Sequence, residues 1–264
     1  MTNATMASVL GPIAPVGLEQ LEASASLMTR RDRKYLVPWG VTQQLIRLLA
    51  PTSHVLEIDD RRSFRYQSVY FDTPALTSYL GAARKRPHRY KVRTRSYLDS
   101  GLCLLEVKTR DGRGRTVKER ISHPFERHSQ LGDGGRAFVS DCSLIGTTAA
   151  ELRPVLTTRY LRSTLLLPEG VRVTIDTELR SQGPDGRGVR LEGMAVVETK
   201  SGGAPSTADR TLWELGYRPI RVSKFCTSLS ALYPELPHNK WTQALRRPWA
   251  VLGQSTTTSG RCSG

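Results

Sequence analysis

Residues 89–95 read Arg-Tyr-Lys-Val-Arg-Thr-Arg, with a cation at every odd position. Because side chains alternate across a β-strand, all four cations would lie on one face, opposite Tyr90 and Val92. This stretch predicts a strand with one strongly basic face. The segments around it indicate what kind of sheet the strand belongs to.

Four further segments alternate in the same way. They place charged or polar side chains on one face at Glu106, Lys108 and Arg110; at Thr116, Lys118 and Arg120; at Arg172, Thr174 and Asp176; and at Glu198 and Lys200. One such strand alone indicates only an antiparallel sheet with one wet face. Together the faces are dominated by Arg and Lys, although like charges opposite one another destabilise a sheet. Residues 84–120 alone hold 13 basic and four acidic side chains.

These alternating faces predict an α+β fold, an antiparallel β-barrel tunnel with a basic lumen. The charged faces would point inward, and several helices would cover the apolar outer faces. A dense cationic interior is unstable when empty, so a polyanion and a divalent metal ion would be expected to relieve it. Arginine grips phosphate oxygens in pairs, and Mg²⁺ or Mn²⁺ takes carboxylate together with phosphate oxygens.

Helices are expected at four places. They would follow Pro38-Trp39-Gly40, Thr73-Pro74, the capping-box-like Ser206-Thr-Ala-Asp209, and Ser223. The Ala-, Ser- and Pro-rich residues 1–28 predict a mobile leader, and residues 241–264 a flexible tail. One domain over residues 29–240 lies between them.

The chain has 264 residues, a formal net charge of +15 and a pI near 10.1. Its 38% hydrophobic and 24% charged residues are typical of a soluble globular protein, and the charge indicates an anionic partner. Coding bias could also contribute, because 31 of the 39 cations are Arg. No apolar run is long enough to span a membrane. The four cysteines are scattered without metal-ligand spacing, which indicates a reducing cytoplasm.

Nine short motifs run in order along residues 30–233. They are Arg33-Lys-Tyr35, Ser68-Val-Tyr-Phe-Asp-Thr73, Lys91-Val-Arg-Thr-Arg95, Leu105-Glu-Val-Lys108, Thr116-Val-Lys-Glu-Arg120, Arg153-Pro-Val-Leu-Thr-Thr-Arg-Tyr-Leu-Arg162, Val171-Arg-Val-Thr-Ile-Asp-Thr177, Val197-Glu-Thr-Lys200 and Ser223-Lys-Phe225. In this order they resemble the catalytic domain of the vacuolar transporter chaperone (VTC) polyphosphate polymerases, in the triphosphate tunnel metalloenzyme (CYTH-like) superfamily. Where relatives often begin with Glu-x-Glu-x-Lys, this chain has Arg30-Arg-Asp-Arg-Lys34.

The resemblance implies a set of site residues. The catalytic group would be Arg93, Arg95, Lys108 and Lys200. Substrate and product would bind Lys34, Lys118, Arg120, Arg162, Arg172 and Lys224. Glu198 would hold Mn²⁺ or Mg²⁺, with Glu106 as a second candidate ligand, while Tyr160 and Asp176 would have supporting roles.

The activity that the resemblance implies is metal-dependent phosphoryl transfer from ATP to a growing inorganic polyphosphate chain. A triphosphatase of the same fold needs almost the same residues, because only the acceptor of the phosphoryl group differs. A nucleic-acid-binding module is a third alternative, but aromatic clusters and recognition motifs are lacking, so no specific nucleic acid is expected. A cytoplasmic location is expected, and any attachment to a membrane would need a separate membrane-protein partner.

Overall fold

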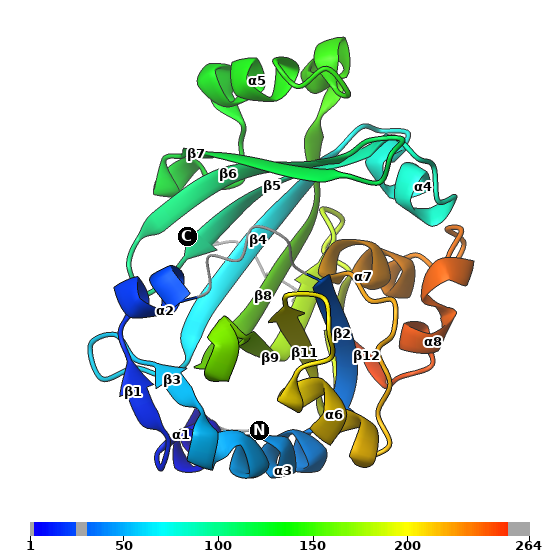
Figure 1. Ribbon diagram of the computed structural model, residues 1–264. Coiled ribbons are helices and arrows are strands. Elements are labelled where there is room, and N and C mark those ends of the chain that lie inside the picture. Colours follow the sequence, from blue (N-terminus) through cyan, green and yellow to red (C-terminus); the bar gives the residue numbers. More distant parts are fainter. Residues whose placement is uncertain (1–2, 25–30, 253–264) are drawn as a thin grey trace, which may run out of the picture.

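The computed structural model describes residues 3–24 and 31–252, and its centre is one twelve-stranded sheet (Figure 1). The strands are β1 (Ala14–Val16), β2 (Arg31–Pro38), β3 (His54–Leu56), β4 (Phe64–Asp72), β5 (Arg89–Tyr97), β6 (Leu102–Arg110), β7 (Thr116–Ser122), β8 (Arg153–Leu166), β9 (Arg172–Gln182), β10 (Gly188–Leu191), β11 (Met194–Ser201) and β12 (Trp249–Leu252). The strands expected from alternation are β5, β6, β7, β9 and β11, so these predictions are confirmed.

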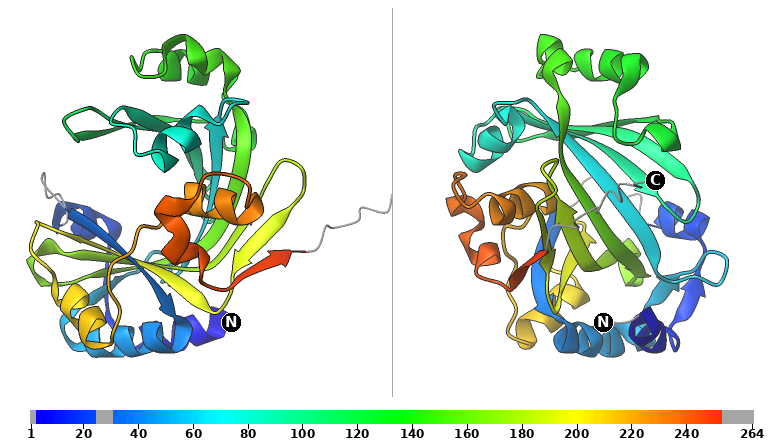
Figure 2. Two further views of the ribbon diagram at one scale, coloured as in Figure 1. Left: turned by 90° about the vertical axis from the view of Figure 1, so that its right-hand side faces the viewer. Right: turned by 180° about the vertical axis from the view of Figure 1, so that it is seen from behind.

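The sheet is antiparallel except where β1 pairs with β3, and it bends around a hollow. Its neighbours run in the order β12-β10-β9-β8-β4-β5-β6-β7, with β11 beside β9 and β2 beside β11. Figure 2 shows the bend from the side: β5, β6 and β7 form an upper wall, β2, β9 and β11 form a lower wall, and β4 and β8 connect them. The strands that carry the basic faces therefore face one another.

The expected closed barrel is not observed. The free edges of β7 and β2, which would have to meet to close it, do not pair with each other. Among the described residues, β7 pairs with β6 alone and β2 with β11 alone. At the free edge of β2, the Ile220 N–H donates to the Lys34 carbonyl at 2.8 Å, so an irregular segment lies where a barrel would have its last strand. The observed architecture is an open, curved antiparallel sheet with flanking helices.

Helices flank this sheet on both its outer and its inner face. They are α1 (Asn3–Leu10), α2 (Leu18–Ser24), α3 (Trp39–Leu49), α4 (Thr77–Ala83), α5 (Gly132–Ser140), α6 (Thr207–Glu214), α7 (Lys224–Leu232) and α8 (Thr242–Leu245), with 3₁₀ turns η1 (Ala50–Thr52), η2 (Phe125–Arg127), η3 (Gly146–Glu151), η4 (Pro168–Gly170) and η5 (Asn239–Trp241). Within residues 3–24 and 31–252, no helix is long and apolar enough to cross a membrane.

The apolar outer faces of both walls pack under these helices. On the upper wall, Val92 and Val107 join Val139 of α5 in one buried cluster. On the lower wall, Val197 packs with Leu45 of α3 in another. Each such side chain contributes roughly 1.5–3 kcal/mol when it is fully buried. Burial of the apolar faces fixes the strand register, and this register turns the alternate charged residues toward the hollow.

The predicted caps of α6 and α7 are confirmed. At α6, the Ser206 hydroxyl accepts from the Asp209 N–H, and the Asp209 carboxylate accepts from the Ser206 N–H, which makes a capping box. At α7, the Ser223 hydroxyl accepts from the Cys226 N–H at 3.2 Å. The cap fixes the first turn of α7, whose first residue, Lys224, carries one of the predicted site side chains.

Helix α4 begins at Thr77, later than the Thr73-Pro74 signal predicts. The carboxylate of Asp72 accepts hydrogen bonds from the N–H groups of Ser78 and Tyr79 at 2.9 Å each. A buried acceptor at the end of β4 therefore binds the free N–H groups of this helix, and the chain needs the intervening residues to turn back toward it.

The N-terminal residues differ from the expectation of a mobile leader. Residues 3–24 form α1, β1 and α2, and Leu10 and Ile13 lie buried in the core below the lower wall. Of the expected tail, η5, α8 and β12 are ordered against the sheet through Leu252. Residues 1–2, 25–28 and 253–264, on which the remaining predictions of mobility rest, lie outside the described residues.

Candidate active site in a cationic hollow

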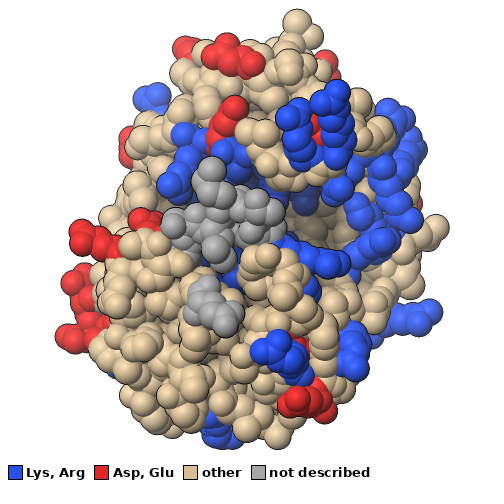
Figure 3. All heavy atoms as spheres, viewed as in Figure 1, with Lys and Arg blue, Asp and Glu red and all other residues tan. Residues whose placement is uncertain are grey.

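The charged faces of both walls meet around a hollow in the middle of the molecule. Figure 3 shows Lys and Arg side chains gathered around this hollow on the face drawn in Figure 1. The upper wall contributes Lys91, Arg93 and Arg95 from β5, while β6 and β7 add Lys108 and Lys118. Because paired residues in neighbouring strands share a face, the rows Lys91–Lys108–Lys118 and Arg93–Glu106–Arg120 run across the wall.

Glu106 is the anionic centre of the upper wall. Its Oε2 accepts from Arg93 Nη2 at 2.6 Å, and its Oε1 pairs with Lys118 Nζ at 2.5 Å and with Arg95 Nη1 at 3.8 Å. The side chain is only 2% exposed. Burial raises the pKa of Glu106, but the charges of Arg93, Arg95 and Lys118 outweigh this and hold it at about 2. Both carboxylate oxygens are therefore occupied by cations.

Asp176 has the same role at the junction of the lower wall and β8. Arg162 binds it through two parallel hydrogen bonds of 2.6 and 2.8 Å, and the Lys224 ammonium from α7 donates to the same carboxylate. The Arg162 guanidinium also lies over the rings of Tyr66 and Tyr160, at 5.1 and 5.4 Å. Burial raises the pKa of Asp176, but Arg162 and Lys224 outweigh it and hold the pKa at about 2. Asp176 thus binds two of the predicted site cations, and its supporting role stays a prediction.

Glu198 of β11 has longer contacts with its neighbouring cations than Glu106 has. Its Oε1 lies 3.1 Å from Lys200 Nζ and 3.8 Å from Lys34 Nζ, and among the described residues no hydrogen bond reaches Oε2. The side chain is 12% exposed. Burial raises the pKa of Glu198, yet Lys34, Lys200 and the more distant Arg162 and Lys224 hold it well below its usual range. Glu198 is therefore ionised and has an oxygen available to a ligand.

The two walls influence each other across the hollow. Burial, followed by the charge of Lys34 on β2, lowers the pKa of Lys108 on β6, although these strands do not pair. Burial also lowers the pKa of Lys200 to about 8, with Arg162 adding to this effect and Glu198 opposing it. The lowered pKa values mean that burial and neighbouring cations destabilise the charged forms of these ammonium groups. An added anion would stabilise the charged forms, so the site favours an anion.

Most of the predicted site residues come together here. The contacts above unite Arg93, Arg95, Lys118 and Glu106 on the upper wall, Lys34, Lys200 and Glu198 on the lower wall, and Arg162 with Lys224 between them; Lys108 joins them electrostatically. Arg172 lies opposite Lys200 in the register of β9 and β11. Arg120 lies opposite Glu106 on β7 but is exposed, and within the described chain no ion pair joins it to the cluster.

Two residues in the hollow were not selected from the sequence. Lys91 donates to Ser223 Oγ at 2.9 Å, and so connects the upper wall to the cap of α7. The Tyr70 hydroxyl accepts from Arg93 at 3.3 Å, and its ring stacks on Phe225 of α7. Burial raises the pKa of Tyr70, but Arg93 and Lys224 outweigh this effect and lower it. The alternation of charges along β5 indicated that Lys91 shares a face with Arg93. The inward face of β4 is uncharged, so no residue pattern indicated Tyr70.

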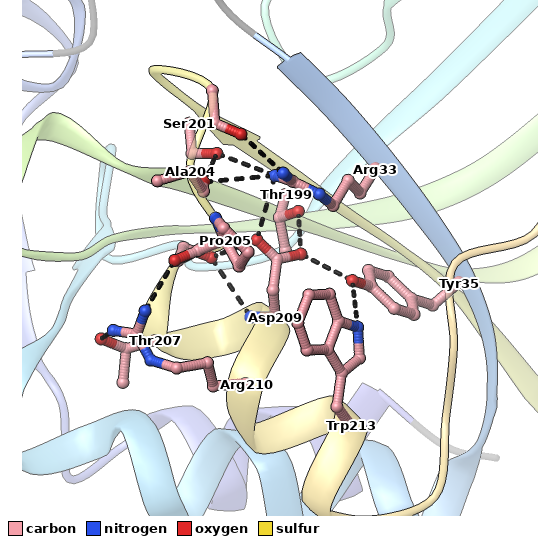
Figure 4. A network of polar contacts seen from close by, with 12 residues as sticks. Arg33, Tyr35, Thr199, Ser201, Ala204, Pro205, Thr207, Asp209, Arg210 and Trp213 are labelled. Carbon is pink, nitrogen blue, oxygen red and sulfur yellow. Dashed lines mark hydrogen bonds and ion pairs between the residues drawn. The ribbon is translucent and has the colours of Figure 1, made fainter.

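Arg33, which belongs to the Arg33-Lys-Tyr35 motif, has a structural role outside the hollow. Alternation along β2 sends Arg33 and Tyr35 away from Lys34, and both reach the buried carboxylate of Asp209, at 3.4 and 2.6 Å (Figure 4). The Thr199 hydroxyl donates to the same carboxylate at 2.6 Å. This network fastens α6 to the outer face of the lower wall.

A divalent metal ion would fit beside Glu198 better than beside Glu106. Glu198 has an unengaged oxygen, and the Thr174 hydroxyl, its cross-strand neighbour on β9, is buried with no hydrogen-bond partner among the described residues. The described residues contain no group of three or more His, Cys, Asp or Glu side chains placed to hold a metal ion. Mg²⁺ characteristically uses one or two carboxylates together with substrate phosphates and water, so one such glutamate is compatible with it.

The curved antiparallel sheet and its cation-lined hollow define the structural class of this protein. The sequence profile of the VTC domain family matches residues 29–233, and the chain belongs to this family. The resemblance inferred from the nine motifs is thereby confirmed. A search of curated proteins gives no match.

Solved structures are similar to this chain at low sequence identity, and the first of the following shares its fold. A Hippeastrum protein, assigned as an adenylyl cyclase and described as having a dominant triphosphatase activity, is 17% identical with a TM-score of 0.51, over 81% of this chain and all of its own. A Bacillus halodurans protein named as an adenylate cyclase is 15% identical, with a TM-score of 0.46 over 74% of this chain and 96% of its own. The PH1819 protein of Pyrococcus horikoshii is also 15% identical, with a TM-score of 0.42 over 81% and 99%.

Proposed function

We propose that this protein transfers a phosphoryl group from ATP or another triphosphate to a growing inorganic polyphosphate chain within the hollow. The observation that supports this proposal best is that cations from seven strands and one helix face a single hollow from both walls. Phosphoryl transfer requires positioning and charge neutralisation rather than a covalent protein nucleophile, and such a hollow supplies both.

The upper wall and Lys200 would hold the donor. Arg93 and Arg95 would bind phosphate oxygens through guanidinium N–H groups that Glu106 does not use, while Glu106 keeps both side chains oriented. A bound triphosphate would oppose the lowering of the pKa values of Lys108 and Lys200 and so favour their charged forms. These four side chains would stabilise the negative charge on the transferring group.

The remaining cations would hold the acceptor and the product. This group consists of Lys34, Lys118, Arg120, Arg162, Arg172 and Lys224. Asp176 would keep Arg162 and Lys224 in fixed orientations, because it binds both of them at one carboxylate. A phosphate chain that lies between the walls could then advance while it remains bound to cations on both sides.

We assign the metal position to Glu198 and give Glu106 a positioning role. The open Oε2 of Glu198 and the unpartnered Thr174 hydroxyl face the hollow side of the lower wall, whereas both oxygens of Glu106 are already bound. A divalent ion bound there would neutralise charge on the phosphoryl group during transfer. Lys34 and Lys200 would keep Glu198 ionised and oriented toward that position.

The products of the reaction test this proposal. Purified protein would be incubated with ATP and Mn²⁺ or Mg²⁺, and the mixture analysed for long anionic polymer on gels with a polyphosphate stain, and for free orthophosphate. The proposal predicts a ladder of polyphosphate and an equivalent amount of ADP. Release of orthophosphate without polymer would contradict it.

A triphosphatase is the second candidate. The Hippeastrum protein with this fold is described as having a dominant triphosphatase activity, and it shares the fold over most of this chain. In that case water would take the place of the phosphate acceptor, and the residues around the donor would keep their roles. Tripolyphosphate supplied alone separates the alternatives, because a triphosphatase converts it to diphosphate and orthophosphate without forming longer chains.

A further inference from the structure

A second cationic cavity lies outside the hollow, between the 219–221 segment, η5 and α8. Its volume is about 590 Å³, and it is lined by Arg221, Lys240 and Arg246 together with the polar side chains of Asn239, Thr242 and Gln243; the apolar residues Pro219 and Ile220 complete the lining. Neither a carboxylate nor an aromatic ring is among its lining residues. Nothing in its lining therefore neutralises the three cations.

This outer cavity adjoins the hollow through a continuous series of cations. Lys240 Nζ donates to the Ala82 carbonyl at the end of α4 at 2.8 Å, which brings η5 against the start of the upper wall. Burial, followed by the charges of Arg89, Lys91 and Arg221, lowers the pKa of Lys240 to about 8. Lys91 itself lines the hollow and binds the cap of α7. The cations thus continue from β5 past the N-terminus of α7 to the outer cavity.

The free edge of β2 connects the same two regions from below. The Ile220 N–H donates to the Lys34 carbonyl, so the residues that line the outer cavity begin directly beside a strand of the hollow. In Figure 3, the Lys and Arg side chains also continue from the hollow toward the side on which Figure 1 draws α4 and α7. A chain longer than the hollow would meet these cations as it leaves.

We infer that the outer cavity binds the part of an inorganic polyphosphate chain that extends beyond the hollow. Lining by cations and neutral polar side chains suits a chain of phosphates, whereas single-stranded nucleic acids are usually held by aromatic side chains that stack on the bases. The inference rests on the proposed function, because it takes its ligand to be the product of that reaction. It adds a second binding site, which only chains longer than the hollow would reach.

The test compares short and long phosphate chains on variants of the outer cavity. In Arg221→Gln/Arg246→Gln both substituted side chains are exposed, so folding should be preserved; Lys240→Gln provides a second variant. The matched control is Arg47→Gln/Arg127→Gln, which removes two exposed arginines on α3 and η2. Affinities for tripolyphosphate, long-chain polyphosphate and a single-stranded oligonucleotide would be measured by calorimetry at two salt concentrations.

We expect the wild type and the control to bind long-chain polyphosphate more tightly than tripolyphosphate. The double variant should lose about tenfold in affinity for the long chain, with a weaker salt dependence, and keep its affinity for tripolyphosphate. An unchanged long-chain affinity, or an equal loss for both ligands, would overturn the inference. So would a loss confined to the oligonucleotide. If the wild-type protein bound tripolyphosphate and long chains equally well, the outer cavity would be excluded as a binding site, but the proposed function would stand. If it bound neither ligand, the inference and the proposed function would both fail.

Discussion

The two walls of the hollow carry the same short motif, Glu106-Val-Lys108 on β6 and Glu198-Thr-Lys200 on β11, in different surroundings. Glu106 lies between Arg93 on β5 and Arg120 on β7, and its carboxylate is 2% exposed with both oxygens in ion pairs. Glu198 lies between Lys34 and the uncharged Thr174. It is 12% exposed, and its nearest cation is 3.1 Å away.

This difference indicates that the neighbouring strands, rather than the motif, decide what each glutamate can do. A glutamate that short, buried ion pairs already bind acts as a fixed counter-ion for the arginines. A glutamate with one unengaged oxygen can accept a metal ion. The following predictions test this division between a positioning wall and a metal-binding wall.

The largest effect is expected from Arg93→Ala/Arg95→Ala, which removes two cations from the upper wall. Loss of both donors should reduce ATP-dependent polymer formation by more than about 100-fold, because in the proposed function they stabilise the negative charge on the transferring group. The variant should still fold, since Lys118 continues to hold Glu106 at 2.5 Å. Circular dichroism would verify folding, with Arg113→Ala/Arg127→Ala as the control. Polymer synthesis at the wild-type rate would refute the assignment.

The next largest effect is expected in stability, from Glu106→Gln. The substitution leaves Arg93 and Lys118 without their buried anion and should lower the free energy of unfolding by about 3 kcal/mol. Urea denaturation measures this loss. The affinity for Mn²⁺ should not change in this variant. A fall in metal affinity without a loss of stability would instead make Glu106 the ligand, and would reverse the comparison between the walls.

Glu198→Gln should have the opposite result. Mn²⁺ affinity in the presence of tripolyphosphate, followed by electron paramagnetic resonance, should fall by at least about tenfold, because a carboxylate ligand becomes a neutral amide. The free energy of unfolding should fall less than in Glu106→Gln, since the contacts to Lys34 and Lys200 are longer than those of Glu106. Unchanged Mn²⁺ affinity would exclude Glu198 as the metal ligand.

The last effect is seen only in acid, as a dependence of stability on pH. Because the pKa of Glu106 is about 2 in the folded protein, below its ordinary value of about 4.5, its stabilising effect is complete above the ordinary value. This effect should disappear as the pH falls toward 2. The difference in unfolding free energy between wild type and Glu106→Gln should therefore shrink between about pH 5 and pH 2. A difference that stayed constant over this range would show that the ion pairs contribute nothing.

The basic faces were predictable from the sequence, because alternation is a local property of each strand. The residues at 89–95 define the inward face of β5 directly, and the positions of Lys108, Lys118 and Lys200 follow from the same rule. The caps at Ser206 and Ser223 were equally local. A sequence pattern of period two needs no knowledge of the neighbouring strands.

Long-range features were not predictable in the same way. Whether the sheet closes depends on its two edge strands, and the Ile220–Lys34 hydrogen bond that covers one edge joins residues far apart in the chain. The different surroundings of Glu106 and Glu198 arise from strand pairing, which a single Glu-x-Lys motif does not encode. Tyr70 was missed because an uncharged strand face gives no signal for an anion site.

The most direct test of the central claim is the effect of tripolyphosphate on thermal stability, measured for the wild type and for Arg93→Ala/Arg95→Ala. A ligand that binds the folded hollow raises the Tm as its concentration exceeds the Kd. The account predicts a clear rise in Tm for the wild type that is nearly lost in the variant and reduced by added salt. An equal rise in both proteins, or none in the wild type, would contradict the claim that this hollow binds phosphate chains.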